Sequence, residues 1–319
     1  MQRLKHKGKI VFVFSDPGGA KPCLALIEES NLTNVIAISD REHSFYKDFN
    51  TPVEILTQGF EDFIDAIKPE LIFTATSYRS DIEQQFIKIA LKRSIACYSF
   101  VDHWTSILKR FEDAAGEIVL PNQVWVIDER AKLLAIEQGI DEDKIVISGN
   151  PYHDWLSNWE PAVSKDNFIS QIGLTNKNKK LLVYAPDPLS NINGKDIYGF
   201  DELSATLELV NLFDEHKIEL KDWIVLVKAH PNQNREELNK VIHDHTIFKP
   251  LANDIDTNTC IYYADIVMGF FSSFLIEAAI MHKPVIRFFN KSIENDPIAE
   301  LNIGTIVNKT TIISNLKSH

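Results

Sequence analysis

Short apolar runs alternate with amphipathic segments along most of the chain. In the first half, each run is rich in β-branched or aromatic residues and is followed by a turn and a segment of helical periodicity. The runs span residues 10–14, 34–39, 53–56, 71–76, 95–100, 123–128 and 144–149. Helices are expected between them at 20–30, 60–68, 80–92 and 129–139. Strands this apolar are buried on both faces, so this half predicts a parallel sheet covered by helices.

The alternation pauses once, in a polar, Trp-containing stretch between about Asn150 and Lys180. It then restarts with the same order of elements. Strands are expected at 181–187, 223–230, 264–269, 284–289 and 304–308, and helices at 202–215, 234–243 and 272–282. The sequence therefore predicts an α/β protein of two Rossmann-like domains, residues 1–155 and 156–319.

Length and composition fit this division. A chain of 319 residues with 45% hydrophobic and 24% charged residues has enough material for two cores. The net charge of −12 argues against nucleic acid as a partner, because binding a phosphate backbone needs concentrated Lys and Arg. The three cysteines have no CxxC spacing, so we expect buried thiols, a reducing compartment and no zinc site. No apolar run approaches the roughly 20 residues of a membrane span, and we expect a cytoplasmic protein.

The loop after the first expected strand, residues 15–20, opens the first expected helix. Free backbone N–H groups at a helix start favour an anion or a hydroxyl-rich ligand, and Gly18 and Gly19 let a phosphate or sugar approach the backbone. Asp16 is a candidate base for the hydroxyl of an acceptor substrate. The alternative is a tight turn in which Asp16 only caps the helix.

A second polar group follows the fifth expected strand, at the sheet edge where open α/β sheets bind ligands. Asp102 and His103 together are a candidate general base, and Trp104 has a ring able to stack on a sugar. Lys109 and Arg110 add positive charge nearby. The alternative is a capped turn with a structural Trp.

In the second half, Lys228 and His230 end an expected strand, and Pro231 fixes the chain as it leaves the sheet. His230 is placed to donate a hydrogen bond to a phosphate of a bound nucleotide, whose charge Lys228 would neutralise. The alternative is the usual structural role of a lone histidine.

Two serines begin the expected helix at 272–282. Ser272 and Ser273 would hold a phosphate together with the backbone N–H groups, and Glu277 would accept hydrogen bonds from ribose hydroxyls. The alternative is a serine N-cap completed by Glu277. Because carboxyl ends of parallel strands meet at one edge, we expect His230 and the serine pair to hold the same phosphate. No DxD-like acidic pair lies beside them, so we expect no metal and no cofactor.

The segments KAHP at 228–231 and ADIVMGFFSSFLIEAAIMHKPVI at 264–286 resemble the nucleotide-binding half of GT-B enzymes that assemble bacterial surface polysaccharides. They are most similar to sialic acid and Kdo transferases, which use CMP-activated keto-sugars, and to CDP-polyol phosphotransferases. In those families the His and the serines contact the donor phosphate. The resemblance therefore implies this role for His230, Ser272 and Ser273.

The resemblance further implies a glycosyltransferase whose two Rossmann-like domains face each other across a cleft. It would move a sugar from a nucleotide-sugar, CMP-linked or other, to a glycan or lipid-linked acceptor in capsule or lipopolysaccharide synthesis. The nucleotide would bind residues 156–319 and the acceptor residues 1–155. Peripheral association with the inner face of the membrane is left open. The alternatives are an isomerase like UDP-N-acetylglucosamine 2-epimerase, and a non-catalytic sugar-nucleotide-binding protein.

Overall fold

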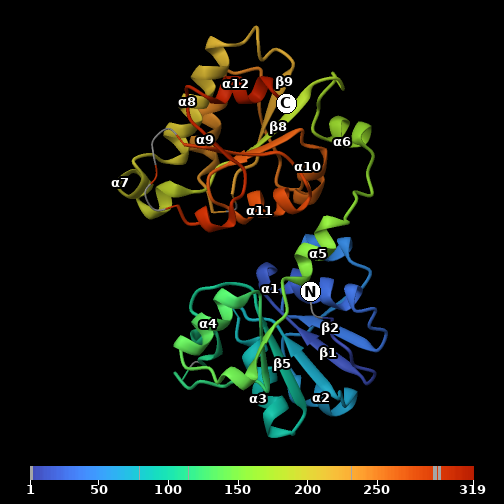
Figure 1. Ribbon diagram of the computed structural model, residues 1–319. Helices are drawn as coiled ribbons and strands as arrows, with labels where there is room; N and C mark the ends of the chain where they lie inside the picture. The colour runs from blue at the N-terminus through green and yellow to red at the C-terminus, as the bar shows by residue number, and fades with distance from the viewer. Residues whose placement is uncertain (1–2, 79, 114, 231, 290–292, 294–295) are drawn as a thin grey trace. The chain divides into compact units, whose positions relative to one another are not determined.

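The computed structural model describes residues 3–78, 80–113, 115–230, 232–289, 293 and 296–319. The chain divides into two compact units, Met1–Trp155 and Leu156–His319 (Figure 1). Each unit is built around its own sheet of parallel strands. The predicted fold class, two Rossmann-like parallel-sheet domains, is confirmed.

The first unit contains a seven-stranded sheet in the order β3-β2-β1-β4-β5-β6-β7. Its strands are β1 (Ile10–Val13), β2 (Val35–Ser39), β3 (Val53–Ile55), β4 (Leu71–Thr74), β5 (Ala96–Val101), β6 (Gln123–Val126) and β7 (Ile145–Ile147). Every apolar run of the first half is thus a strand. The strand order reverses between β1 and β4, which places the ligand crevice of this topology at the carboxyl ends of those two strands.

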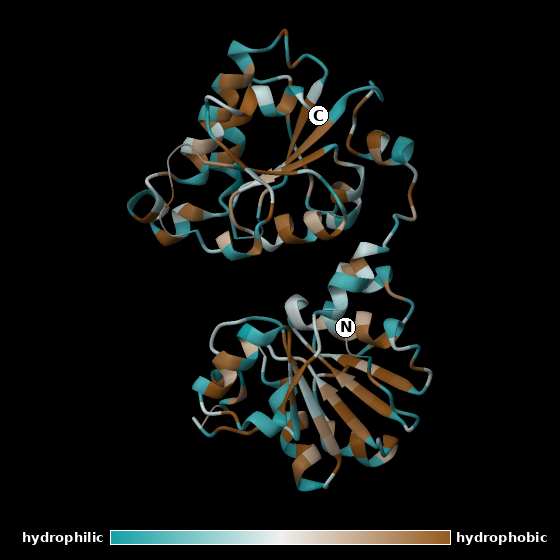
Figure 2. Ribbon diagram, viewed as in Figure 1, coloured by the Kyte–Doolittle hydropathy of each residue, from teal (hydrophilic) through white to brown (hydrophobic). Residues whose placement is uncertain are grey.

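Helices follow the strands of the first unit, and its brown strands in Figure 2 mark the apolar core between them. The α-helices are α1 (Pro17–Glu29), α2 (Phe60–Ile67), α3 (Ile82–Lys92), α4 (Glu129–Glu137) and α5 (Pro151–Ser157). Short 3₁₀ helices are η1 (Ser44–Asp48), η2 (Leu108–Phe111) and η3 (Glu142–Lys144). Trp155 of α5 stacks on Phe49 with ring centroids 4.4 Å apart and donates its indole N–H to Glu28 at 2.9 Å. These contacts attach α5 to the first unit.

The second unit has six parallel strands in the order β10-β9-β8-β11-β12-β13. They are β8 (Lys180–Ala185), β9 (Trp223–Val227), β10 (Phe248–Pro250), β11 (Ile266–Gly269), β12 (Val285–Phe288) and β13 (Thr305–Val307). Strand β10, at one edge of the sheet, was not expected from the sequence. The order matches that of the first six strands in the first unit, so here the reversal lies between β8 and β11.

The helices of the second unit include four that the sequence did not predict: α6, α7, α10 and α12. The full set is α6 (Lys165–Gln171), α7 (Gly194–Tyr198), α8 (Glu202–Glu215), α9 (Arg235–Ile242), α10 (Thr257–Tyr263), α11 (Ser273–Ile280) and α12 (Ile312–Lys317), with η4 (Leu189–Ile192) and η5 (Ala299–Leu301). The three cysteines are free and buried, as expected. Among the helices described, none combines the length and apolar character that a membrane crossing requires.

Candidate functional site

Gly18 and Gly19 bring the start of α1 against its neighbours at the strand-order reversal of the first unit. A Cβ on Gly19 would lie 2.4 Å from the Ala75 Cβ, just after β4. A Cβ on Gly18 would lie 2.3 Å from an Asp102 carboxylate oxygen. Both distances are far shorter than a real contact. The Asp102 side chain could move away from a residue at position 18, whereas the Ala75 Cβ is fixed to its backbone, so a side chain at position 19 would displace the start of α1. Gly19 therefore has a packing role, and the expected role of both glycines in ligand binding stays a prediction.

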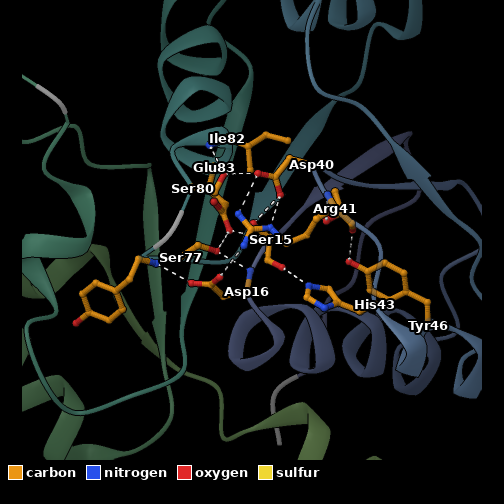
Figure 3. Close-up of polar contacts among 12 residues, drawn as sticks. Ser15, Asp16, Asp40, Arg41, His43, Tyr46, Ser77, Ser80, Ile82 and Glu83 are labelled. Atoms are coloured by element: carbon orange, nitrogen blue, oxygen red, sulfur yellow. Dashed lines mark hydrogen bonds and ion pairs between the residues drawn. The ribbon is translucent and has the colours of Figure 1, made fainter. Parts of the chain in front are cut away.

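Asp16 lies at the N-cap position of α1, yet its side chain makes no capping hydrogen bond. Its carboxylate accepts the Tyr78 N–H at 2.8 Å and lies 3.7 Å from the guanidinium of Arg41 (Figure 3). The side chain retains 24% exposure. Asp16 is thus a partly exposed carboxylate at the ligand edge of the sheet, and the simple capping alternative does not describe it.

A buried carboxylate, Glu83 of α3, holds the loop that carries Asp16. Its Oε1 accepts the Ser15 N–H at 3.0 Å and the hydroxyl of Ser77, and the Ser77 oxygen accepts the Asp16 N–H at 2.9 Å. The Glu83 pKa is raised to about 7, chiefly by burial and in smaller part by the charges of Asp16 and Asp40, while the hydrogen bond from Ser77 opposes the shift. Sequence analysis did not single out Glu83.

Asp40, which follows β2, joins the same network from the other side. It accepts hydrogen bonds from Ser15 Oγ at 2.6 Å, Ser80 Oγ at 2.7 Å and Arg41 Nε at 3.2 Å. Burial opposes its ionisation, but these hydrogen bonds outweigh burial and hold the Asp40 pKa below its ordinary value. His43 Nε2 lies 2.8 Å from the Ser15 carbonyl oxygen. The residues after β1, β2 and β4 therefore form one polar cluster.

Asp102 and His103 do not form a hydrogen-bonded pair within the described chain. Asp102 bonds to Arg110 at 2.9 Å, and the Arg110 side chain is only 5% exposed. His103 is exposed, and its Nδ1 accepts the Thr105 N–H at 3.1 Å. The neutral ring therefore carries its proton on Nε2. Desolvation lowers the His103 pKa. Because Asp102 and His103 bond to different partners, each is a separate candidate base and the two do not form a dyad.

The indole of Trp104 has a structural contact. Its N–H donates to Asp128 at 2.8 Å, and the other oxygen of that carboxylate accepts the Ala131 N–H at 2.8 Å as the N-cap of α4. The guanidinium of Arg130 lies 5.6 Å from the indole ring centroid. The structural alternative thus describes Trp104 better than a sugar-stacking role.

Gly269, which ends β11, marks the strand-order reversal of the second unit. A Cβ there would lie 2.6 Å from the Ala185 carbonyl oxygen at the end of β8. Asp187 lies two residues after the end of β8. Its carboxylate accepts the Phe271 N–H at 3.0 Å, and the N–H groups of Phe270 and Ser272 also stabilise its charge. Burial nevertheless raises the Asp187 pKa. A carboxylate that sequence analysis missed therefore lies at the turn expected to bind phosphate.

Ser272 is the N-cap residue of α11, but its hydroxyl makes no capping hydrogen bond. Its Oγ is buried and has no hydrogen-bond partner among the described residues. Ser273, the first residue of the helix, is exposed, and Glu277 one turn later is partly buried. The serine-cap alternative does not describe Ser272, which leaves its hydroxyl available to a ligand.

His230 has a defined tautomer. Its Nδ1 accepts the Asn232 N–H at 3.1 Å, and its own backbone N–H donates to Gln233 Oε1 at 3.0 Å. Desolvation lowers the His230 pKa, so the ring is neutral at pH 7 with a donor N–H at Nε2. Lys228 donates to the Ile255 carbonyl oxygen at 3.4 Å.

Pro231 lies outside the described residues. The remaining candidates of the second unit follow strands on the two sides of β8, since β9 and β11 both pair with it. Neighbouring strands are about 4.8 Å apart, so the ends of β9 and β11 are separated by about 10 Å. His230 and Ser272 therefore belong to one edge of one sheet, and Asp187 follows β8, the strand between them.

Comparison with known proteins agrees with these observations. The family model described as "CDP-Glycerol:Poly(glycerophosphate) glycerophosphotransferase" matches residues 128–294, more than half of the chain. This range includes Lys228, His230, Ser272, Ser273 and Glu277, whereas the candidates of the first unit precede it. The predicted resemblance to the CDP-polyol transferases is confirmed. Among curated proteins, no significant match was found.

Solved structures with similar folds include several UDP-GlcNAc 2-epimerases. The enzyme from Methanocaldococcus jannaschii has a TM-score of 0.69 and 14% identity over 97% of this chain and 92% of that one. The Neisseria meningitidis enzyme bound to UDP-GlcNAc has a TM-score of 0.69 and 13% identity over 97% and 90%. A putative Listeria monocytogenes epimerase has a TM-score of 0.65 and 14% identity over 98% and 88%. At such low identity the likeness is one of fold.

Proposed function

Because this chain belongs to the CDP-glycerol:poly(glycerophosphate) glycerophosphotransferase family, we propose that it is a transferase that uses a nucleotide-activated donor to build a cell-surface polymer. The donor is a cytidine nucleotide, and the acceptor is a hydroxyl of a glycan or a lipid-linked chain. The transferred group is a polyol phosphate, or else a sugar, as the wider GT-B resemblance implies. The second unit binds the donor, and the first supplies the acceptor chemistry.

The observation that carries this proposal is the free Ser272 hydroxyl. It is buried at the start of α11, without a partner in the described chain, and belongs to the same sheet edge as the neutral N–H of His230. A helix N-terminus with a free hydroxyl suits a phosphate oxygen, and the His230 N–H at the same sheet edge is a second donor for the nucleotide phosphates. The family match to CDP-glycerol glycerophosphotransferases favours a CDP-linked donor over a CMP-linked one.

In the proposed reaction, the acceptor hydroxyl attacks the phosphorus of the polyol phosphate. The bond from that phosphorus to the bridging oxygen breaks, and CMP leaves with the bonding electrons. Hydrogen bonds from His230 and the start of α11 stabilise the charge that develops on the leaving phosphate. Asp16 takes the proton of the attacking hydroxyl. For a sugar donor, the attacked atom would be the anomeric carbon. We propose that neither route needs a metal or a cofactor.

The first experiment is a calorimetric binding screen of CMP, CDP, UMP, UDP and GDP, each with and without a chelator. We expect CDP to bind most tightly and the chelator to change nothing. Product analysis with CDP-glycerol and a short poly(glycerophosphate) acceptor should then show chain extension and release of CMP. A clear preference for uridine nucleotides would contradict the cytidine donor, and a chelator-sensitive affinity would contradict metal independence.

A second candidate is an isomerase that acts on a UDP-sugar. The similarity in fold to UDP-GlcNAc 2-epimerases over 97% of the chain favours it. Incubation with UDP-GlcNAc and no acceptor separates the two functions, because an isomerase forms the 2-epimer and a transferase leaves the substrate intact. A third candidate, a non-catalytic sugar-nucleotide-binding protein, would bind nucleotide in the screen and turn over neither donor.

A further inference from the structure

Glu83 holds two consecutive backbone N–H groups of the loop that follows β1. It accepts the Ser15 N–H directly at 3.0 Å. It reaches the next N–H, that of Asp16, through the hydroxyl of Ser77, which donates to Glu83 and accepts from Asp16 at 2.9 Å. Figure 3 shows Ser15, Asp16 and Ser77 converging on this carboxylate from two loops. One oxygen of Glu83 therefore holds the backbone of both loop residues.

The second carboxylate oxygen of Glu83 has no hydrogen bond among the described residues to offset the loss of its hydration. Glu83 is 3% exposed, and its Oε2 is buried with no hydrogen-bond partner in the part of the chain that the structure describes. A neutral Gln would offer the same accepting oxygen without burying a charge. Burying an ionised carboxylate costs free energy that a purely structural residue would not need to spend. What the carboxylate adds is a set of hydrogen bonds whose strength depends on its ionisation.

We propose that Glu83 is the positioning residue of Asp16: the ionised carboxylate fixes the Ser15–Asp16 loop in its productive place, and protonation releases it. The inference rests on the proposed function, in which Asp16 receives the proton of the acceptor hydroxyl. A hydrogen bond to a charged acceptor is stronger than one to a neutral acceptor. Protonation therefore weakens both bonds at once.

The groups around Glu83 bring its protonation close to neutral pH. The Glu83 pKa is raised to about 7, chiefly by burial, and the charges of two neighbouring carboxylates are part of that shift. The titratable and charged groups that interact with Glu83 come from the β1–α1 loop, α1, the segment after β2, and η1. They are Asp16, Cys23, Asp40, Arg41 and Tyr46. Arg41 is the cation among them, and its ion pair with Asp40 offsets part of the repulsion on Glu83.

The test follows the backbone amides of Ser15 and Asp16 by NMR between about pH 5.5 and about 8.5, a range that brackets the titration of Glu83. In the wild-type protein both amides should shift with a midpoint near 7. In Glu83→Gln neither should show that transition. In Ser77→Ala the Ser15 amide should still respond while the Asp16 amide loses most of its response, because only the indirect hold is cut. Glu61→Gln, which changes an exposed carboxylate of α2, is the matched control.

Turnover gives the second measurement. In the wild type, kcat should rise about tenfold as the pH increases through 7, whereas Glu83→Gln should stay at the low level throughout with an unchanged KM for the donor. Amides that do not respond in the wild type, or that respond equally in Glu83→Gln, would overturn the inference. So would a wild-type pH profile of kcat in Glu83→Gln. If no donor is turned over at all, the proposed function fails, and the amide titration still decides whether Glu83 positions the loop.

Discussion

Phe271 donates its backbone N–H to the carboxylate of Asp187 at 3.0 Å, across the strand-order reversal of the second unit. The turn that leads into α11 is thus already engaged by an internal anion. A phosphate at the proposed donor site would use the donors that remain, namely the Ser272 hydroxyl, Ser273 and the first N–H groups of the helix. It would also lie near the negative charge of Asp187.

Asp187→Asn should therefore bind the donor nucleotide roughly tenfold more tightly than the wild type, because one charge repelling the phosphate is removed while an accepting oxygen stays. Burial raises the Asp187 pKa, so its charge is complete only above that raised pKa. The gain should be largest at high pH and shrink as the pH falls through the pKa of Asp187. Calorimetry at several pH values measures it. Weaker binding by the variant would show that the carboxylate is needed to shape the turn.

His230→Ala should weaken nucleotide binding by roughly ten- to a hundredfold, since one hydrogen bond to a charged phosphate is lost. Ser272→Ala should act similarly, and Ser273→Ala less, because its hydroxyl is exposed. The double variant of His230 and Ser272 should lose less than the sum if both hold one phosphate group. His243→Ala, which removes an exposed histidine of the same unit, is the control. Additive losses would instead indicate that the two residues hold separate phosphates of the donor.

Asp16→Asn should lower turnover by at least about a hundredfold, the usual minimum for loss of a general base. The affinity for nucleotide should not change, because the proposed donor site belongs to the second unit. His103→Ala, measured in parallel, tests the second candidate base. If both variants keep more than about a tenth of the wild-type rate, neither residue is the base.

Asp102→Asn should destabilise the protein by about 3 kcal/mol, because it leaves the buried guanidinium of Arg110 without its carboxylate. Denaturant unfolding measures the loss. Asp65→Asn removes one of the two carboxylates that pair with Arg93 between α2 and the end of α3, so it should cost much less stability. Equal losses of stability in the two variants would mean that the burial of Arg110 does not determine how much its ion pair with Asp102 stabilises the protein.

Glu83→Gln should be more stable than the wild type at pH 8 by roughly 3 kcal/mol, the equivalent of a displacement of about 2.5 pKa units. The folded-state pKa of Glu83, about 7, lies above that of an unfolded chain. The wild type therefore loses stability as the pH rises from about 4.5 to about 7, whereas the variant does not lose this contribution. Melting temperatures at pH 5 and pH 8 should differ less in the variant. A parallel pH dependence in both proteins would contradict the assignment.

The strands could be predicted from the sequence because their apolar runs are long and buried on both faces. Strand β10 could not, since it has three residues and ends in Pro250, which normally argues against a strand. At the site, the motif residues were found by their place after strands. Which side chains then bond to each other does not follow from such placement, as when Asp102 pairs with Arg110 and not with His103.

Glu83 was missed although the sequence carries its signal. It precedes Phe86, Ile87 and Ala90 by three, four and seven residues, which is the spacing of one helical face, and all four are buried. A Glu on the apolar face of an amphipathic helix is unusual, and it indicates a carboxylate with a specific role. Asp187 carries no comparable signal, because the pattern around it describes only the end of a strand.

Strand β10 also bears on how this protein behaves at high concentration. An edge strand presents unpaired N–H and C=O groups on which another chain can add a strand, and this is a common start of aggregation. Here the edge is three residues long, Lys249 places a charge on it, and Pro250 has no N–H to offer. This side of the second sheet is therefore a poor template for a further strand, which protects the protein from edge-to-edge association.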